Sequence, residues 1–196
     1  MIIWLNGAFG AGKTTCAFEL NRRLPNSFVY DPENVGFFIR KNIPSELYKP
    51  NFQDHEEWRS FNYTMLTKLY QEFKGTIIVP MTIINSQYYE EIIQQLINDG
   101  AVLKHYILYA DKETILNRLN KRFRRGDTWA KSQIDQCIYA FNNDITEEKI
   151  ITDNRRIDSV VDEIAKKSGL HLFPDNRAYL KKLIDRAITL IKHIRL

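Results

Sequence analysis

Residues 7–14 constrain the fold more than any other part of the chain. They read GAFGAGKT, which satisfies the pattern GxxxxGK[ST] of a phosphate-binding loop. The apolar run at residues 1–5 predicts a strand before the loop, and the apolar spacing of residues 13–24 predicts a helix after it. Strand, loop and helix therefore follow one another in the order that phosphate binding requires, and a plain glycine-rich turn is the weaker interpretation.

Each part of this loop has a predicted role. Glycines let backbone N–H groups turn toward a phosphate, Lys13 reaches the outer phosphates, and the Thr14 hydroxyl can bind Mg²⁺. A helix that begins near Gly12 directs the positive end of its dipole at the same anion. The predicted nucleotide-binding residues are Gly7, Ala8, Phe9, Gly10, Ala11, Gly12, Lys13, Thr14 and Thr15.

The size and charge of the chain fit a nucleotide-binding domain. Its 196 residues have the length of one domain, and we expect a single kinase-like domain over residues 1–196. The net charge of +4 favours anionic partners, but nucleotide phosphates satisfy so small an excess as well as nucleic acid does. Basic residues are dispersed and no nucleic-acid-binding module is recognisable, so we expect no nucleic-acid partner.

Cysteine content and hydropathy predict a cytoplasmic protein. Cys16 and Cys137 are the only cysteines, which indicates a reducing compartment rather than a disulfide framework. The amino terminus lacks a charged region followed by a long apolar stretch, so we interpret it as a first strand and not as a signal peptide. No apolar run is long enough to span a bilayer.

Strand and helix patterns alternate along the chain. Alternation of this kind predicts an α/β fold, with a five-stranded parallel sheet covered by helices on both faces. By analogy with P-loop kinases we expect the strand order 2-3-1-4-5. The predicted strands are residues 2–6, 27–30, 76–79, 102–109 and 149–152, and the main helices between and after them are residues 13–24, 86–98, 130–142 and 157–167.

The carboxyl ends of the strands hold the candidate acids. Motor proteins with such loops place a Mg²⁺-binding acid after a strand beside the loop strand, but the third strand here runs into Pro80 and Met81 and has no carboxylate. Asp111 follows the fourth strand, where it opens a helix; capping is the first interpretation and metal binding the second.

Asp31, after the second strand, is the better acid. It can accept a proton from a substrate hydroxyl or hold Mg²⁺ through water. As a helix N-cap, with Pro32 at the first helical position, it uses only one oxygen, so capping and catalysis are compatible. Glu33 is the reserve candidate.

Residues 118–129 contain the most basic stretch and are the predicted lid. Phosphoryl transfer needs cations around the transferred group, although a solvated basic helix face is the alternative interpretation. Arg118 and Arg122 share i, i+4 spacing and are the predicted phosphate contacts, with catalytic roles. Trp129 can stack on a base or pack in the core.

Residues 33–74 are too long for a simple crossover and are the predicted acceptor-binding insertion. Large apolar faces mixed with charged and amide groups are typical of a pocket for an extended polar molecule, although core packing is the commoner role of any single aromatic residue. The predicted substrate-binding residues are Asp31, Phe37, Arg40, Trp58, Arg59, Asn62 and Thr82.

Residues 177–196 predict a basic amphipathic helix. It either packs on its own sheet, which is the commoner arrangement, or lies on an anionic membrane surface. Its apolar residues are Leu180, Leu183, Ile184, Ala187, Ile188, Ile191 and Ile194, and its basic residues are Lys181, Lys182, Arg186, Lys192 and Arg195.

With these residues in view, the chain closely resembles the tunicamycin resistance proteins of the TmrB type, and more distantly antibiotic and shikimate kinases. The resemblance implies ATP binding through residues 7–14 and protection against tunicamycin, a nucleoside antibiotic. In the distant kinases an acid after the second strand is the base, and Asp31 matches that position. The motifs that carry the close resemblance are IIWLNGAFG at 2–10, YDPE at 30–33, WRSFNY at 58–63, IVPMTI at 78–83, WA at 129–130 with QID at 133–135, and TDN at 152–154.

Two functions from different classes remain open. The leading hypothesis is an ATP- and Mg²⁺-dependent kinase that phosphorylates a hydroxyl of tunicamycin or a similar nucleoside. One alternative is an ATP-dependent protein that binds and sequesters the drug, with the last helix as its membrane contact. The other is a nucleoside or nucleotide kinase that uses the same site.

Overall fold

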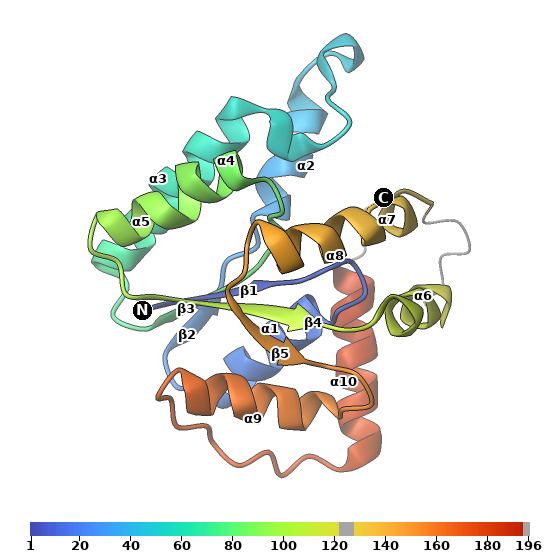
Figure 1. Cartoon of the computed structure of the whole chain (residues 1–196). Coiled ribbons are helices and arrows are strands. Elements are labelled where there is room, and N and C mark those ends of the chain that lie inside the picture. The colour runs from blue at the N-terminus through green and yellow to red at the C-terminus, as the bar shows by residue number, and fades with distance from the viewer. Residues whose placement is uncertain (122–127, 194–196) are drawn as a thin grey trace.

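A computed structural model describes residues 1–121 and 128–193. Its sheet has five strands in the order β2-β3-β1-β4-β5, and all of the neighbouring strands pair in parallel, which confirms the predicted fold class and strand order (Figure 1). The strands are β1 (Ile2–Asn6), β2 (Ser27–Val29), β3 (Thr76–Pro80), β4 (Leu103–Tyr109) and β5 (Glu148–Ile151).

Helices surround this sheet and connect its strands (Figure 1). A helix predicted at residues 86–98 is present but contains a π-helical stretch, η3 (Glu90–Gln94), between α4 and α5. Two short 3₁₀ turns, η1 (Ser45–Leu47) and η2 (Phe52–Asp54), lie between α2 and α3. The α-helices are α1 (Lys13–Arg23), α2 (Glu33–Asn42), α3 (Glu56–Glu72), α4 (Ser86–Tyr89), α5 (Gln95–Asn98), α6 (Lys112–Lys121), α7 (Thr128–Ser132), α8 (Ile134–Asn143), α9 (Ile157–Lys167) and α10 (Tyr179–Lys192).

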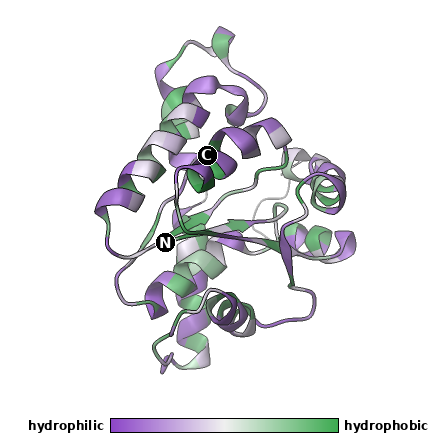
Figure 2. Ribbon diagram, turned by 60° about the vertical axis from the view of Figure 1, so that its left-hand side comes forward, coloured by the Kyte–Doolittle hydropathy of each residue, from purple (hydrophilic) through white to green (hydrophobic). Residues whose placement is uncertain are grey.

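The two faces of the sheet are covered by two separate cores. Alternate residues of β1 point to opposite faces: Trp4 packs with side chains of α3, α5 and α8, whereas Leu5 packs with side chains of α1 and α9. Every residue of β1 and β3 is buried, because helices cover both faces of a parallel sheet. Apolar residues accordingly concentrate along the strands at the centre of the molecule (Figure 2).

Some boundaries differ from those predicted. The helix expected at residues 130–142 is divided into α7 and α8, and β5 begins one residue early, at Glu148. The carboxyl-terminal helix begins at Tyr179 rather than at residue 177, since Ala178 has extended backbone with ψ of 149°. The last three residues of that predicted helix, 194–196, lie outside the described part of the chain.

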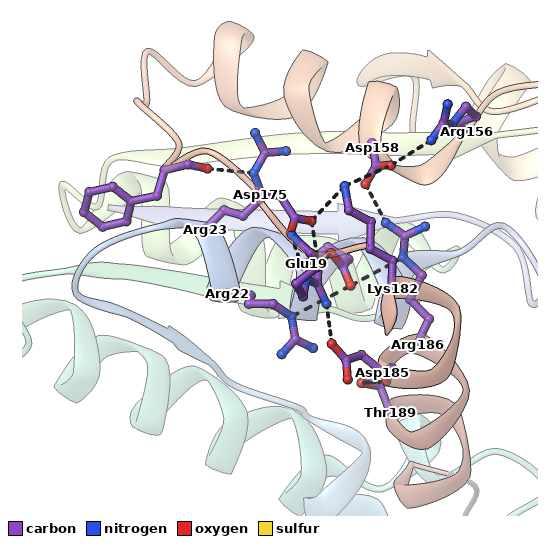
Figure 3. Close-up of polar contacts among 12 residues, drawn as sticks. Glu19, Arg22, Arg23, Arg156, Asp158, Asp175, Lys182, Asp185, Arg186 and Thr189 are labelled. Atoms are coloured by element: carbon purple, nitrogen blue, oxygen red, sulfur yellow. Dashed lines mark hydrogen bonds and ion pairs between the residues drawn. The ribbon is translucent and has the colours of Figure 1, made fainter. Parts of the chain in front are cut away.

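The orientation of α10 was not predictable from its amphipathic pattern. Its half-buried residues Lys182, Asp185 and Arg186 face α1 and α9, where Arg186 contacts Glu19 and Asp158 (Figure 3). Most of its large apolar side chains are turned outward instead, and only Leu190 among them is half-buried. The exposed ones are Tyr179 (60%), Leu180 (72%), Leu183 (43%), Ile184 (59%), Ile188 (45%) and Ile191 (62%). The helix is therefore fixed to the domain mainly by charge, with its apolar face uncovered by the described part of the chain.

Three carboxylates lie at the centre of this attachment, with oxygens within 4.8 Å of one another: those of Glu19, Asp158 and Asp175. Arg177 binds Asp175 at 2.8 Å, and Lys182 approaches the same carboxylate at 3.1 Å. Because basic side chains pair with all three acids, we interpret the group as an ion-pair network and not as a metal site. The cations are Arg22, Arg156, Arg177, Lys182 and Arg186.

The hydrogen bond from Arg177 holds the pKa of Asp175 well below its usual range. A carboxyl whose pKa is lowered by folding stabilises the folded state above its unfolded pKa. That contribution is lost as the pH falls through about 4 and below. The attachment of α10 is therefore expected to be complete at neutral pH.

Candidate nucleotide and acceptor site

The loop between β1 and α1 has the backbone conformation that a phosphate cradle needs. Gly7, Gly10 and Gly12 have φ of 139°, 92° and 102°, in the region that side chains disfavour. A Cβ added at Gly7 would lie only 2.5 Å from the carbonyl oxygen of Leu108 on β4, so that position admits glycine alone. Helix α1 starts directly after Gly12 and has no acidic residue in its first turn, so its amino-terminal N–H groups favour an anion.

Lys13 lies inside the loop. Its Nζ donates to the carbonyl oxygens of Gly7 at 2.9 Å and Ala8 at 3.2 Å, and lies 5.3 Å from the centre of the Phe9 ring. The side chains of Lys13 and Thr15 are buried and Thr14 is half-buried in the first turn of α1. A lysine held at the helix start, beside glycines that leave room for phosphate oxygens, fits the triphosphate of a nucleotide with Mg²⁺.

Two buried side chains fix the loop from behind. Asn6, which is 0% exposed, accepts hydrogen bonds from the N–H groups of Gly7 and Ile83 at 2.9 and 3.0 Å. Thr82, which is 5% exposed, donates from Oγ1 to the Gly7 carbonyl oxygen at 2.8 Å. Thr82 was predicted to bind substrate, whereas its hydroxyl here holds the loop. Asn6 was not among the predicted site residues. Its position, as an amide side chain at the end of an apolar strand, could have indicated a role in holding the loop.

Asp31 follows β2 at the same edge of the sheet as the loop. Its Oδ1 accepts a hydrogen bond from the N–H of Glu33 at 3.0 Å, so the hydrogen bond expected of this carboxylate is present. Helix α2 nevertheless begins at Glu33, one residue later than expected, with Pro32 in the cap position. The carbonyl oxygen of Pro32 accepts from the indole of Trp58 at 3.0 Å, which fixes the turn that carries the acid.

Trp58 and Asn62, two of the predicted substrate-binding residues, are both 0% exposed. Asn62 accepts from the Tyr30 hydroxyl at 2.8 Å and donates to the Trp58 carbonyl oxygen at 2.7 Å. Burial, and secondarily the charge of Asp31, raises the pKa of Tyr30, so the phenol remains a hydrogen-bond donor. Both residues are therefore bonded to the chain neighbours of Asp31, Trp58 to Pro32 and Asn62 to Tyr30.

The remaining predicted residues of the insertion surround the 3₁₀ turn η2. The rings of Phe37 and Phe52 lie 6.3 Å apart, and the guanidinium of Arg40 lies 5.9 Å from the Phe52 ring. Arg40 also donates to the carbonyl oxygen of Pro50 at 3.1 Å. Arg59 is 9% exposed and pairs with Glu91. Phe37 is half-buried, and Phe37 and Arg40 on α2 form a small cluster with Phe52 of η2.

On the other side of the loop, the basic stretch is described only in part. Arg118, on α6, donates to the hydroxyl and the carbonyl oxygen of Thr152 at 3.0 and 2.6 Å, at the end of β5. Arg122, the other predicted phosphate contact, lies outside the described residues. Trp129, on α7, is 43% exposed and meets the edge of Phe9 with ring centres 5.0 Å apart. The structure therefore brings α7 onto the phosphate-binding loop.

The acids near β4 and β5 bond to backbone groups. Asp153 accepts hydrogen bonds from the N–H of Asp111 at 3.1 and 3.2 Å, and the Asp111 carbonyl oxygen accepts from Ile115 at 3.0 Å, which places Asp111 at the start of α6. β3, which pairs with β1, runs into Pro80, Met81 and Thr82 without a carboxylate.

This loop, on a parallel sheet of order 2-3-1-4-5 with an acid after β2, defines a P-loop protein of kinase-like fold. A family model described as an AAA domain matches residues 3–136. A sugar kinase from Janibacter has a TM-score of 0.59 at 18% identity, covering 86% of this chain and 94% of its own. A shikimate kinase from Bacteroides thetaiotaomicron also has a TM-score of 0.59 at 18% identity, covering 87% of this chain and 99% of its own. These two kinases show the fold alone.

A third solved structure shows the family to which the chain belongs. The tunicamycin resistance protein of Deinococcus radiodurans is 30% identical, has a TM-score of 0.75, and covers 89% of this chain and 98% of its own. The chain belongs to the family of tunicamycin resistance proteins, within the AAA domain family of P-loop proteins. No curated protein matches the sequence significantly. Among the helices of residues 1–121 and 128–193, none is long and apolar enough to cross a membrane.

Proposed function

We propose that the protein is a kinase that transfers the terminal phosphate of ATP to a hydroxyl of tunicamycin or a related nucleoside. The observation that carries the proposal is the position of Asp31, which follows β2 at the sheet edge that holds the loop, while β3 ends without an acid. An acid at the end of β2 can face an acceptor over the loop, as phosphoryl transfer to an alcohol requires.

In the proposed reaction, the acceptor hydroxyl oxygen forms a bond to the terminal phosphorus as the bond to the ADP oxygen breaks, and Asp31 accepts the hydroxyl proton. Lys13 stabilises the charge on the phosphates, with Arg118 and Arg122 as the proposed additional cations. Thr14 would hold Mg²⁺ directly and Asp31 through water. Bound Mg²⁺ would neutralise charge on the phosphate oxygens.

The acceptor is proposed to lie over residues 33–74. The aromatic cluster of Phe37 and Phe52, with the nearby guanidinium of Arg40, offers apolar and cationic groups on and against α2, the helix that follows Asp31 in the chain. The lid is proposed to span residues 118–129, and the contact between Phe9 and Trp129 is the part of it that the described residues support.

Mass spectrometry of the drug tests this proposal against sequestration. After incubation with MgATP, tunicamycin is expected to gain one phosphoryl group, and the Lys13→Ala variant serves as the inactive control. An unchanged drug mass together with tight, ATP-dependent binding would establish a sequestering protein instead. Phosphorylation of nucleosides or nucleotides, but not of the drug, would establish the third candidate.

We also propose that α10 places the protein at the inner surface of the cytoplasmic membrane. Its apolar residues are exposed because charged residues, not apolar ones, attach the helix to α1 and α9. Lys182 and Arg186 are used in that attachment, so among the described residues the exposed cations of this helix are Lys181 and Lys192. Insertion of apolar side chains should therefore contribute more to binding than attraction to anionic lipid.

Vesicle sedimentation tests this placement. The full-length protein should pellet with phosphatidylglycerol-containing vesicles. The triple variant Leu180→Ser, Ile184→Ser, Ile188→Ser should lower binding by roughly tenfold or more, because three exposed apolar side chains that would insert into the lipid are lost. Val102→Ser is the matched control, since Val102 is 54% exposed on a different surface. Equal pelleting of the triple variant and the wild type would contradict the proposal.

A further inference from the structure

A line of hydrogen bonds joins the predicted acceptor segment to the catalytic lysine. The carbonyl oxygen of Gly7 accepts from both Lys13 Nζ, at 2.9 Å, and Thr82 Oγ1, at 2.8 Å. The carbonyl oxygen of Thr82 in turn accepts from Gln53 Nε2 at 2.7 Å. Gln53 belongs to the 3₁₀ turn η2 of the insertion, so these contacts reach from the insertion to the phosphate-binding loop.

The line continues on the far side of Gln53. Arg59 Nη1 donates to the Gln53 carbonyl oxygen at 2.8 Å, and its Nε pairs with Glu91 in the π-helical stretch η3. The Arg59 guanidinium also lies 4.6 Å from the centre of the Tyr88 ring. Burial opposes ionisation of Glu91, but the hydrogen bonds from Arg59 and Gln87 and the charge of Arg59 together hold its pKa below the usual range, so this acid stays ionised. The turn that carries Gln53 is therefore held from both sides.

These side chains are buried as well as bonded. Gln53 and Thr82 are each 5% exposed. Hydrogen bonds are strengthened at sites of low solvent access, and a buried carbonyl left without a donor costs about 1–3 kcal/mol. A movement of η2 is therefore expected to change the hydrogen bonding of the Gly7 carbonyl oxygen, because water has little access to replace these buried bonds.

We propose that Thr82 is a positioning residue that sets how readily Lys13 leaves the loop carbonyls for a phosphate, and that Gln53 couples occupancy of the acceptor segment to Thr82. When Lys13 turns to a phosphate, Gly7 loses one donor and Thr82 keeps the carbonyl satisfied. Without the Thr82 hydroxyl, Gly7 depends on Lys13 alone, so Lys13 is held back and nucleotide binds less tightly. The inference rests on the proposed function only in placing the acceptor over residues 33–74.

Binding of the fluorescent analogue mant-AMPPNP with Mg²⁺ tests the positioning role of Thr82, because this measurement requires no turnover. Thr82→Val should weaken binding by roughly tenfold, the loss expected when one buried carbonyl is left without its second donor. Thr82→Ser restores the hydroxyl and should return the affinity to within about twofold of wild type. Should Thr82→Val fail to fold, Thr82→Ala compared with Thr82→Ser gives the same contrast. Wild-type affinity in the hydroxyl-free variant would overturn the role of Thr82.

The coupling to the acceptor segment is tested by adding saturating tunicamycin to the same titrations. The wild type should change its affinity for mant-AMPPNP when the drug is present. Gln53→Met, which keeps side-chain length and removes the amide donor, should abolish that change while keeping drug-free affinity within about threefold. A drug effect that survives in Gln53→Met, or none in the wild type, would overturn the coupling.

Failure of this inference is distinguishable from failure of the proposed function. If the drug gains a phosphoryl group but Thr82→Val binds nucleotide normally, only the positioning role is overturned. If the drug mass is unchanged and Thr82→Val shows the loss that Thr82→Ser restores, the kinase proposal fails and the positioning role stands.

Discussion

Replacement of Asp31 by Asn is expected to leave nucleotide binding intact and to lower the rate of phosphotransfer by roughly 10²–10⁴-fold, the usual contribution of a general base. Asn keeps an oxygen that can accept the hydrogen bond from the N–H of Glu33, so the start of α2 should be preserved. Its amide cannot accept the proton of the substrate hydroxyl. Single-turnover kinetics with MgATP and tunicamycin, together with titration of mant-AMPPNP, measure the two quantities separately.

Asp111→Asn is the matched control for this experiment. Asp111 is an exposed acid at the start of α6, on the same sheet edge, and its bonds to Asp153 and Ile115 involve its backbone. Turnover should therefore stay near the wild-type rate. Full activity in Asp31→Asn would place the base elsewhere, and Glu33→Gln would then be the next variant to measure.

Replacement of Lys13 by Ala is expected to lower the affinity for MgATP by on the order of 100-fold and to abolish drug resistance. The ammonium group lies inside the predicted phosphate-binding loop, on the carbonyl oxygens of Gly7 and Ala8, and a hydrogen bond to a charged partner contributes about 1.5–3 kcal/mol. Loss of the side chain should not unfold the loop, because Thr82 still donates to Gly7 and Asn6 still accepts from its N–H. Isothermal titration with MgATP measures the effect.

A lysine outside the loop provides the control. Lys112, on α6, pairs with Asp135 at 2.6 Å and is more than half exposed, so Lys112→Ala should bind MgATP with wild-type affinity. If Lys13→Ala also keeps wild-type affinity while folded, as judged by circular dichroism, residues 7–14 do not form the nucleotide site.

Local sequence patterns were sufficient for most of the secondary structure. Apolar runs with turn residues between them predicted all five strands to within one residue at each end, because a buried parallel strand is apolar on both faces. The loop was recognisable because glycines at fixed spacing and a Lys-Thr pair are needed together. The hydrogen bond expected at the Asp31 carboxylate is also present, since it joins residues only two positions apart, although the helix begins one residue later than expected.

Contacts between distant residues were not predictable in the same way. The side chains of Trp58 and Asn62 have the mixed character of a binding pocket, yet both are buried and bonded to residues 26 and 32 positions earlier, Pro32 and Tyr30. Thr82 follows β3 at the expected edge, but its partner Gly7 is 75 positions away. Residue type indicates that such groups need a partner, and only the packing of the chain determines which partner they have.

The sequence by itself determined the phosphate-binding loop, the five strands and the amphipathic character of residues 179–192, because each depends on spacing within a short segment. The tertiary structure alone decided that α10 turns its charged face toward the domain. An amphipathic pattern indicates that one face of a helix is apolar, but it does not indicate which face packs against the rest of the domain. Glu19 on α1, with Asp158 and Asp175, supplies negative charge that forms ion pairs with Arg177, Lys182 and Arg186. The apolar face of α10 is therefore left exposed.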